Sequence, residues 1–477
     1  MKKIFFISFL FVSIAGFSQF YNGLQMNFGK NRIQYNNFVW QYYRDSKVDV
    51  YFYQNGEALA KEALMIVKRK LPELTYFFQY DLQQRIIILV YNKLTDFRQS
   101  NIGLITGDLQ YNIGGVTQVL GNKIFVYFDG NREQFETEIT KSLAQIFINE
   151  MVYGTDFKTR MANSTLIAFP EWYLKGLISY ISTEWNTDID NQVRDGILSG
   201  RYEKFNSLIG DEATYAGHSI WNYIAIKYGK QVIPNIVYLT KVSKNIDAGF
   251  MYVIGTSLKY LSYDWLNFYD EWYYKQEQLR VMPTGNFILK KSKKNTVYQQ
   301  LKINPVYPNL VTYQTNQKGK VKIWLQDIKT GKKKRIYRKG HTLEQITDYS
   351  NPVLCWHPQG DILTFTNEYQ GKVWLNLYDI KTKKLERREL TDIQKVLDYD
   401  YSPDGFQIIM SVVSHGHSDI SIYSMVGASF EKITDDAADD LSPHFIENGK
   451  KIIFSSNRSS NTLIANTDSL ITPNNIF

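Results

Sequence analysis

Residues 356–361 read Trp-His-Pro-Gln-Gly-Asp, and residues 401–405 read Tyr-Ser-Pro-Asp-Gly. A looser copy, Leu-Ser-Pro-His, stands at residues 441–444, and the prolines of the three copies are separated by 45 and then 40 residues. Each copy is followed by a short apolar stretch that can form a strand: 362–365, 408–410 and 452–454. Short strands that recur with turn residues every ~40–45 residues are typical of the blades of a β-propeller.

A second pair of matching segments agrees with this repeat. Residues 324–331 (WLQDIKTG) match residues 377–382 (LYDIKT). Together with residues 454–458 (FSSNR), the Ser-Pro-Asp-Gly turn and its strand resemble the blade repeat of TolB-type propellers. The resemblance starts near Pro308 and implies about four blades. Propellers of that family usually have more blades, so we expect an incomplete ring with exposed strand edges, either a fragment or completed from elsewhere.

The first eighteen residues predict export. Two lysines precede the apolar run 4–17, which is shorter than the ~20 residues that a spanning helix needs. Gly16 and Ser18 have the spacing that a signal peptidase recognises, so we expect a signal peptide over 1–18, with an uncleaved anchor as the alternative. The mature chain is expected in the periplasm or at the outer membrane, without a transmembrane span.

Residues 19–282 predict an α+β domain in which strands come early and helices late. Three stretches have the pattern of strands: 48–53, 85–91 and 123–128. Four stretches have the apolar spacing of helices: 57–71 with Pro72 after its end, 133–152, 170–183 and 219–228. Residues 283–300 are charged and rich in turn formers, so we expect a linker there and the propeller blades over 301–477.

The first domain resembles the peptidase MA-like gluzincins over residues 27–273. The resemblance rests on three motifs and their order: 36–40 (NNFVW), 170–177 (PEWYLKGL) and 215–221 (YAGHSIW). It implies a zincin-like fold, in which two histidines one turn apart on a helix and a glutamate on a later helix hold zinc. A glutamate beside the first histidine would be the general base. In that family the later helix typically reads Pro-Glu-Trp, two residues, then Glu-Gly-Leu.

This chain departs from that pattern at all four positions. The apolar pattern of residues 138–147 places Lys141 and Gln145 at the histidine positions and Ser142 at the general base. Lys175 stands where the later glutamate is expected, while the surrounding motif residues are retained: Pro170, Glu171, Trp172, Gly176 and Trp221. Protonated lysines cannot bind zinc and repel it. The resemblance therefore implies a pseudopeptidase that holds neither a metal nor another cofactor.

The number of histidines also excludes a zinc site of this type, without any comparison with the family. Of six in the chain, only His218 lies within 19–282, so no two-histidine zinc helix can form there. We interpret His218 as a surface or capping residue, and His415-Gly416-His417 as a blade loop without specific metal binding. Cys355 is the only cysteine, which excludes an intramolecular disulfide, and its apolar neighbours predict a buried strand.

The net charge of +8 includes two basic runs, 290–294 and 332–335. We interpret the first as part of the linker and the second as a solvated turn after a strand. Nucleic-acid binding needs a continuous basic face, which scattered runs do not predict, so no nucleic-acid partner is expected.

These observations favour an exported, envelope-associated scaffold without catalytic activity, which binds protein or peptide partners through the degenerate cleft and the propeller. The partner's identity and the oligomeric state stay open. An alternative is a hydrolase in which Ser142 is the nucleophile and Lys141 or Lys175 the base. In that case the lysines would lie near Ser142 in an open pocket, whereas otherwise they would pair with Glu138 or Glu171. A truncated gene product is the third possibility.

Overall fold

The computed structural model describes residues 34, 36–100, 119–154, 169–278, 280–281, 284–285, 287–289, 295–342 and 347–458, and the backbone of 475–476. The predicted signal peptide and the basic run 290–294 lie outside these residues. Within the described part, no helix is both long enough and apolar enough to cross a membrane.

The N-terminal part is built on a five-stranded mixed sheet. Its strands are arranged in the order β1-β2-β3-β5-β4. The three central strands are parallel, and the edge strands β1 and β4 are antiparallel to their neighbours. The bounds are β1 (Gln41–Arg44), β2 (Val48–Phe52), β3 (Ile86–Tyr91), β4 (Val119–Leu120) and β5 (Lys123–Tyr127).

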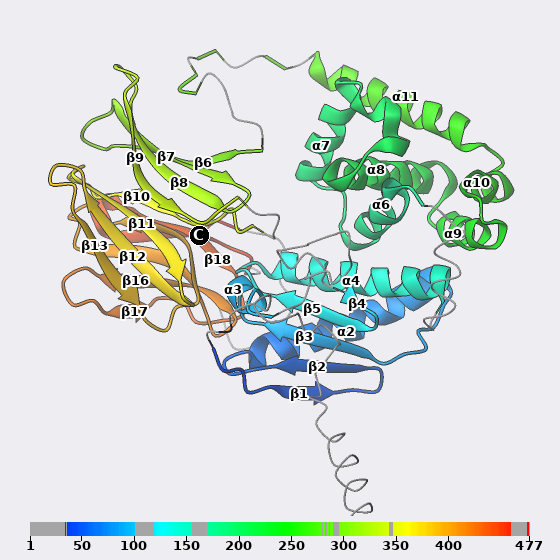
Figure 1. Cartoon of the computed structure of the whole chain (residues 1–477), viewed down its shortest axis with the longest axis horizontal. Coiled ribbons are helices and arrows are strands. Elements are labelled where there is room, and N and C mark those ends of the chain that lie inside the picture. The colour runs from blue at the N-terminus through cyan, green and yellow to red at the C-terminus, as the bar shows by residue number, and fades with distance from the viewer. Residues whose placement is uncertain are drawn as a thin grey trace, which may run out of the picture.

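Both faces of this sheet are buried, which explains the continuous apolar runs of β3 and of β5 after Lys123. Strand β2 is also buried throughout, and its one charged residue, Asp49, pairs with Arg44 and Arg85. One face packs against α2 (Glu57–Phe78) and α4 (Arg132–Tyr153), in a core that includes Val50, Ile88 and Ile124. The opposite face carries an aromatic cluster under the short helix α3 (Leu94–Phe97) and the segment that precedes β1. Figure 1 shows α2 and α4 lying along the sheet.

The prediction that the first helix ends before Pro72 is wrong. Helix α2 continues to Phe78 with Pro72 inside it. A proline inside a helix costs ~3 kcal/mol because a hydrogen bond is lost and the ring crowds the preceding turn. Leu74 and Phe78 lie beyond the proline and are buried in the main core, and this burial offsets the cost.

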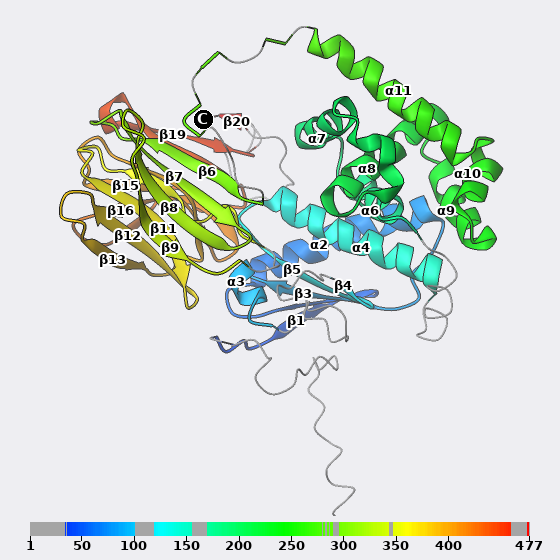
Figure 2. The same ribbon diagram turned by 45° about the horizontal axis from the view of Figure 1, so that its top comes forward.

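Helices fill the rest of the first domain, as the order of the sequence predicts. After α4 come α6 (Glu171–Ser182), α7 (Thr187–Leu198), a 3₁₀ segment η2 (Arg201–Ser207), α8 (Gly210–Tyr228), α9 (Val232–Ser243), α10 (Ile246–Ile254) and α11 (Leu258–Glu277). Helix α8 begins nine residues before the expected start at 219. Figure 2 shows α6 next to α4 and α8 next to α6, with α11 on the outer side.

The C-terminal part consists of four antiparallel sheets in chain order. The first three have four strands each, and the fourth has three. The strands are β6 (Val297–Ile303), β7 (Leu310–Gln317), β8 (Lys320–Asp327), β9 (Lys333–Lys339), β10 (Leu354–Trp356), β11 (Ile362–Tyr369), β12 (Lys372–Asp379), β13 (Leu385–Leu390), β14 (Lys395–Tyr401), β15 (Gln407–Ser414), β16 (His417–Ser424), β17 (Phe430–Lys432), β18 (Asp440–Ile446), β19 (Lys451–Ser456) and β20 (Asn475–Ile476).

These sheets stack as propeller blades. Apolar side chains pack blade 1 on blade 2 and blade 2 on blade 3. The first strands of successive blades, β6, β10, β14 and β18, contact one another, as strands around a propeller axis do. Cys355 is buried in β10, as predicted. The repeat seen in the sequence is therefore confirmed as a series of blades (Figures 1 and 2).

Two details of the blades differ from the sequence expectations. Strand β6 begins at Val297, so the last four residues of the expected linker belong to blade 1. The basic run 332–335 is mostly strand rather than turn, because Lys333 opens the outer strand β9. Charged side chains are tolerated there because an edge strand faces solvent, and they discourage pairing with other chains.

Candidate functional site

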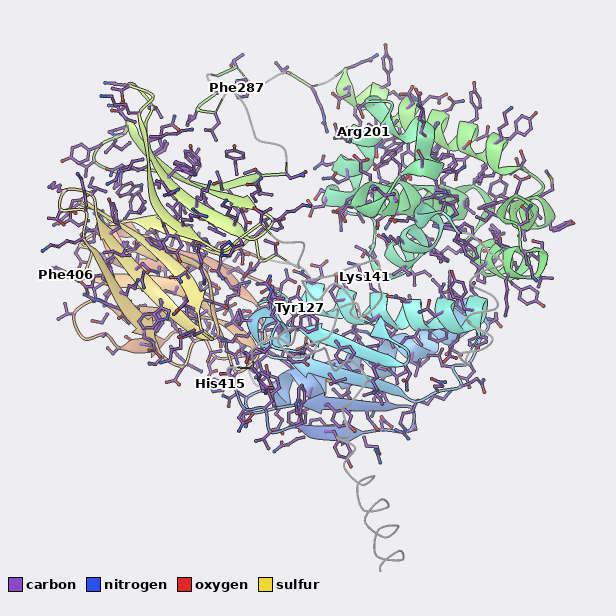
Figure 3. All side chains as sticks on the ribbon, in the orientation of Figure 1. Tyr127, Lys141, Arg201, Phe287, Phe406 and His415 are labelled. Atoms are coloured by element: carbon purple, nitrogen blue, oxygen red, sulfur yellow. The ribbon has the colours of Figure 1, made fainter. Side chains whose placement is uncertain are left out.

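Helix α4 carries three of the four positions at which the resemblance places the zinc site of the gluzincins. Lys141 and Gln145 are one turn apart and both half-buried, so they share one face of the helix. Ser142, the residue after Lys141, is only 2% exposed. Figure 3 shows Lys141 on the side of α4 that faces the later helices.

Local contacts occupy the polar groups of α4. The Lys141 ammonium donates a hydrogen bond of 2.8 Å to the carboxylate of Glu138 on the preceding turn. The Ser142 hydroxyl donates to the backbone carbonyl of the same Glu138, also at 2.8 Å. A serine that donates to the carbonyl four residues earlier is typical of a structural serine inside a helix.

Helix α6 shows the same arrangement at Lys175. Its ammonium is about half exposed and pairs with Glu171 one turn earlier. The Glu171 carboxylate also accepts a hydrogen bond of 2.8 Å from the backbone of Gly210, where α8 begins. The hydrogen bonds from Lys175 and Gly210 hold the pKa of Glu171 below its ordinary value. Glu171 therefore joins the starts of two helices.

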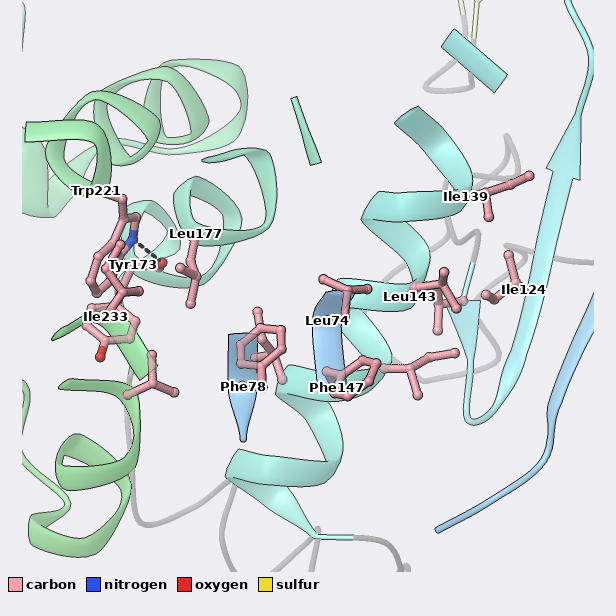
Figure 4. Packing of buried hydrophobic residues seen from close by; sticks show 14 of the residues in the cluster. Leu74, Phe78, Ile124, Ile139, Leu143, Phe147, Tyr173, Leu177, Trp221 and Ile233 are labelled. Carbon is pink, nitrogen blue, oxygen red and sulfur yellow. Dashed lines mark hydrogen bonds between the residues drawn. The ribbon is translucent and has the colours of Figure 1, made fainter. Parts of the chain in front are cut away.

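The retained motif residues hold α6 against α8. Gly176 lies so close to Gly217 of α8 that a Cβ on Gly176 would come within 2.3 Å of the Gly217 Cα. The indole of Trp172 donates to Asn206 at 2.7 Å, and the indole of Trp221 donates to the Tyr173 carbonyl at 3.0 Å. Figure 4 shows this last bond beside the core. Their observed role is packing between helices.

The interpretation of His218 as a surface or capping residue is wrong. It lies in the middle of α8, is 1% exposed, and its Nδ1 is 2.9 Å from the Ser179 hydroxyl. Tyr180 and Trp185 contact its ring edge-on. Burial lowers the pKa of His218 to about 4, which keeps the ring neutral. The apolar stretch that predicted this helix starts at 219, whereas α8 begins nine residues earlier, so the prediction placed His218 just outside the helix.

The expected geometry of a serine–lysine pair is not observed. No hydrogen bond joins Ser142 to Lys141 or Lys175 among the described residues, and each lysine is bound to a carboxylate of its own helix. No group of three or more histidine, cysteine or acidic side chains in the described ranges is arranged to hold a metal ion.

A second cluster of functional groups lies where the blades meet the N-terminal sheet. Lys395, the first residue of β14, is 3% exposed and pairs with Asp129 of the N-terminal domain and, at 3.3 Å, with Asp348 of blade 2. Burial alone lowers the pKa of Lys395, but the two carboxylates outweigh it and keep the pKa above its ordinary value. The ammonium is therefore charged and links the two parts.

Arg132, at the start of α4, makes a parallel set of contacts. Its side chain pairs with Glu62 of α2 and donates to the Gly416 carbonyl of blade 3 at 3.1 Å. Its backbone amide donates to Asp439 at 2.8 Å. Burial raises the pKa of Asp439 to about 6, although Arg132 opposes this. Nδ1 of His417 lies 3.2 Å from the guanidinium of Arg132, so this histidine faces a cation.

The blades approach the N-terminal domain through a repeated tight turn. Three hairpins have a left-handed residue followed by glycine: Lys318-Gly319, Gln370-Gly371 and His415-Gly416. Asn-Gly-like turns of this type suit the twist of a β-hairpin. The loop expected at His415 is confirmed as one of them, and Figure 3 shows His415 at the junction while Phe406 lies at the far outer edge. The glycines that recur at these hairpins are a sequence signal for the tight turns, and the sequence analysis did not use it.

Together these features define the class of protein: an α/β domain with an all-helical second half, bound through buried ion pairs to propeller-type blades. No protein-family model matches the chain, and no curated protein matches it.

Solved structures match parts of the chain. TolB from Acinetobacter baumannii is 21% identical with a TM-score of 0.29, over 35% of this chain and 39% of that protein. The TolB of Agrobacterium tumefaciens is 20% identical with a TM-score of 0.22, over 34% of this chain and 70% of that protein. The tricorn protease is 15% identical with a TM-score of 0.22, over 37% of this chain and 21% of that protein. The matched part is less than half of the Acinetobacter protein.

Proposed function

We propose that this chain is an exported, non-catalytic scaffold of the cell envelope. A zinc-peptidase-like domain without a metal site, together with TolB-like blades, would bind protein or peptide partners. One observation carries the proposal: the motif residues that pack α6 against α8 are present, while Lys141 and Lys175, at two positions where the resemblance places zinc ligands, pair within their own helices. A domain that has the helix packing of an enzyme family but not its zinc ligands and general base is suited to binding rather than to catalysis.

Exposed aromatic side chains on the outer helices support a binding role. On α10 and α11, five large aromatic residues are more than half exposed: Tyr252, Tyr260, Tyr263, Trp272 and Tyr274. Tyrosine and tryptophan are enriched in protein interfaces because they offer a large contact area at a low cost in conformational entropy. Helix α9 separates α10 and α11 from α8 in the chain, and α11 contacts α8 in the fold.

The catalytic part of the proposal is tested with a variant that rebuilds three ligands, Lys141→His, Gln145→His and Lys175→Glu. We expect the purified native protein to hold no stoichiometric zinc and to cleave no peptide substrate, and the variant to gain zinc at a ratio near one. Metal analysis and a broad peptidase assay measure both. Stoichiometric zinc or peptide hydrolysis in the native protein would contradict the proposal. A variant that folds but gains no zinc would contradict the alignment of Lys141, Gln145 and Lys175.

The binding part is tested by selecting peptides from a random display library on the full chain and measuring their affinity by fluorescence anisotropy. We expect Lys141→Glu with Lys175→Glu, or Tyr260→Ser with Tyr263→Ser, to weaken the selected peptides at least about tenfold. Phe406→Ser is the matched control, because Phe406 is equally exposed but lies on the far edge of the blades. Equal losses in all three variants, or no selected peptide, would refute the binding role.

A further inference from the structure

Two adjoining cavities lie between α3 and blades 1 and 2. One has a volume of about 230 Å³ and the other of about 210 Å³. Four residues line both of them: Thr95, Arg98, Lys339 and Glu368. We call this combined space the junction pocket. Its walls come from the N-terminal domain, from blades 1 and 2, and from Lys395 of blade 3. Interfaces between domains are a common place for small-molecule sites.

Several charged groups around the junction pocket are used to hold the two parts together. Lys395 is bound to Asp129 and Asp348. The Lys93 ammonium donates to the Gly371 carbonyl in a blade hairpin at 2.8 Å. These groups therefore form a charged frame, and binding a ligand does not require them to change partners.

Lys339 and Glu368 differ from this frame. Lys339 is the last residue of β9 in blade 1, and Glu368 lies near the end of β11 in blade 2. Both side chains are half-buried and line both cavities, and neither forms an ion pair with the other or with another described residue. The Lys339 ammonium lies 5.8 Å from the centre of the Tyr369 ring, which is a cation–π contact.

The surroundings of Lys339 and Glu368 raise the free energy of their charged forms. Burial lowers the pKa of Lys339, the nearby Glu368 carboxylate partly restores it, and Arg98 lowers it further. Burial raises the pKa of Glu368. A half-buried ammonium and a half-buried carboxylate in one cavity, not bound to each other, are both stabilised by a ligand that brings the opposite charges.

We propose that the junction pocket binds a small zwitterion of amino-acid size, with its carboxylate toward Lys339 and its ammonium toward Glu368. A simple anion would satisfy Lys339 but be repelled by Glu368. A simple cation would satisfy Glu368 but be repelled by Lys339 and by Arg98, which lines both cavities. The polar amides of Asn316, Asn351 and Asn367 line the same space and can bind the remaining polar atoms of such a ligand. This site is separate from the α4–α6 face and does not depend on the proposed scaffold role.

The test is calorimetric titration of the full chain with the twenty standard amino acids and D-alanine. We expect at least one to bind with a ratio of one, at least about tenfold more tightly than acetate or methylammonium. Lys339→Met and Glu368→Gln should each abolish the preference for the zwitterion. Lys372→Met is the matched control, because this lysine of blade 2 is paired with Glu389 outside the pocket.

Three results would overturn the proposal. The first is that no amino acid in the panel binds at millimolar concentration. The second is that Glu368→Gln binds the selected amino acid as well as the native protein does, which would leave only an anion site. The third is that Lys372→Met loses as much affinity as the pocket variants. Small-angle scattering of each variant checks that the two parts of the molecule remain together, so that a lost ligand site is not confused with a separated junction.

Discussion

At the scale of single residues, the crossing of α6 and α8 depends on two glycines. A Cβ on Gly217 would lie 2.0 Å from the Trp172 carbonyl oxygen, and one on Gly176 would meet the backbone of Gly217. Neither backbone atom can move without shifting a whole helix. The motif resemblance identified Gly176, but nothing in the sequence indicated that Gly217 is its partner.

We expect Gly217→Ala to lower the free energy of unfolding by ~1–3 kcal/mol, because overpacking at a backbone contact forces the helices apart. The sign of the change in the free energy of unfolding is informative. Alanine is a better helix former than glycine, so at a helix position with free space around it the same substitution would stabilise the protein by up to ~1 kcal/mol. Denaturant unfolding measures the change. The control is Gly285→Ala, where nothing lies within 4 Å of the added methyl group, and an equal loss there would contradict the explanation.

His218 gives a prediction about pH. Its pKa is about 4 in the folded chain and about 6.5 when unfolded, so folding excludes a proton between these values. The stability that the neutral ring contributes is complete above pH ~6.5 and is lost as the pH falls toward 4, by up to ~3 kcal/mol. Urea unfolding followed by tryptophan fluorescence at several pH values measures it.

The comparison variant is His218→Gln, which keeps a polar group near Ser179 but does not titrate in this range. Other groups also titrate, so the relevant quantity is the difference between the native protein and the variant. A difference that is independent of pH between 6.5 and 4 would show that His218 is not held neutral.

At the scale of elements, the hairpin between β15 and β16 joins blade 3 to the first domain. Its turn glycine, Gly416, has φ of +84°, and a Cβ there would lie 2.7 Å from Leu59 of α2. The backbone carbonyl of Gly416 accepts a hydrogen bond from the guanidinium of Arg132. The sequence predicted a loop at this position, but the contact with α2 became evident only from the structure because the two segments are more than 350 residues apart.

We expect Gly416→Val to loosen the junction between the blades and the first domain, seen as faster cleavage by a protease in the linker and a larger radius of gyration. Gly331→Val is a matched control, because Gly331 has a similar φ of +69° but nothing within 4 Å of a Cβ. Both variants carry the backbone strain of a side chain in the left-handed region. If Gly331→Val loosened the junction equally, the strain rather than the contact with Leu59 would be responsible.

At the scale of the whole molecule, buried charges link the two parts, beside an apolar contact of Val413 and Leu397 with the core of the first domain. Lys395 bridges Asp129 and Asp348, and Arg132 bridges Glu62 and Asp439. Such pairs add little net stability compared with apolar residues, but they are costly to break from one side because the partner charge stays buried. They therefore fix the relative position of the domain and the blades.

We expect Lys395→Met to destabilise the molecule by ~3–5 kcal/mol, because it leaves the carboxylates of Asp129 and Asp348 unpaired. Adding Asp129→Asn to this variant should recover part of the loss, since one uncompensated charge is removed. Thermal unfolding measures both. If the double variant were no more stable than Lys395→Met, the charges would not be coupled.

The sequence alone determined the elements with strong local periodicity or repetition. The turn motifs at 356–361 and 401–405 predicted the blades, and the apolar runs predicted the three central strands of the sheet. It also determined that only one histidine, His218, is present in the first domain. These features follow from short-range patterns, because turn chemistry and side-chain alternation act within a few residues.

The tertiary structure determined the features that depend on contacts between residues far apart in the sequence. Helix α2 continues beyond Pro72 because Leu74 and Phe78 are buried in the core. His218 is buried because α8 packs against α6. Folding also brought Lys339 and Glu368 together from two blades, and joined Lys395 to Asp129. None of these has a local signature, because the free energy of burial and of a buried charge depends on partners far away in the chain.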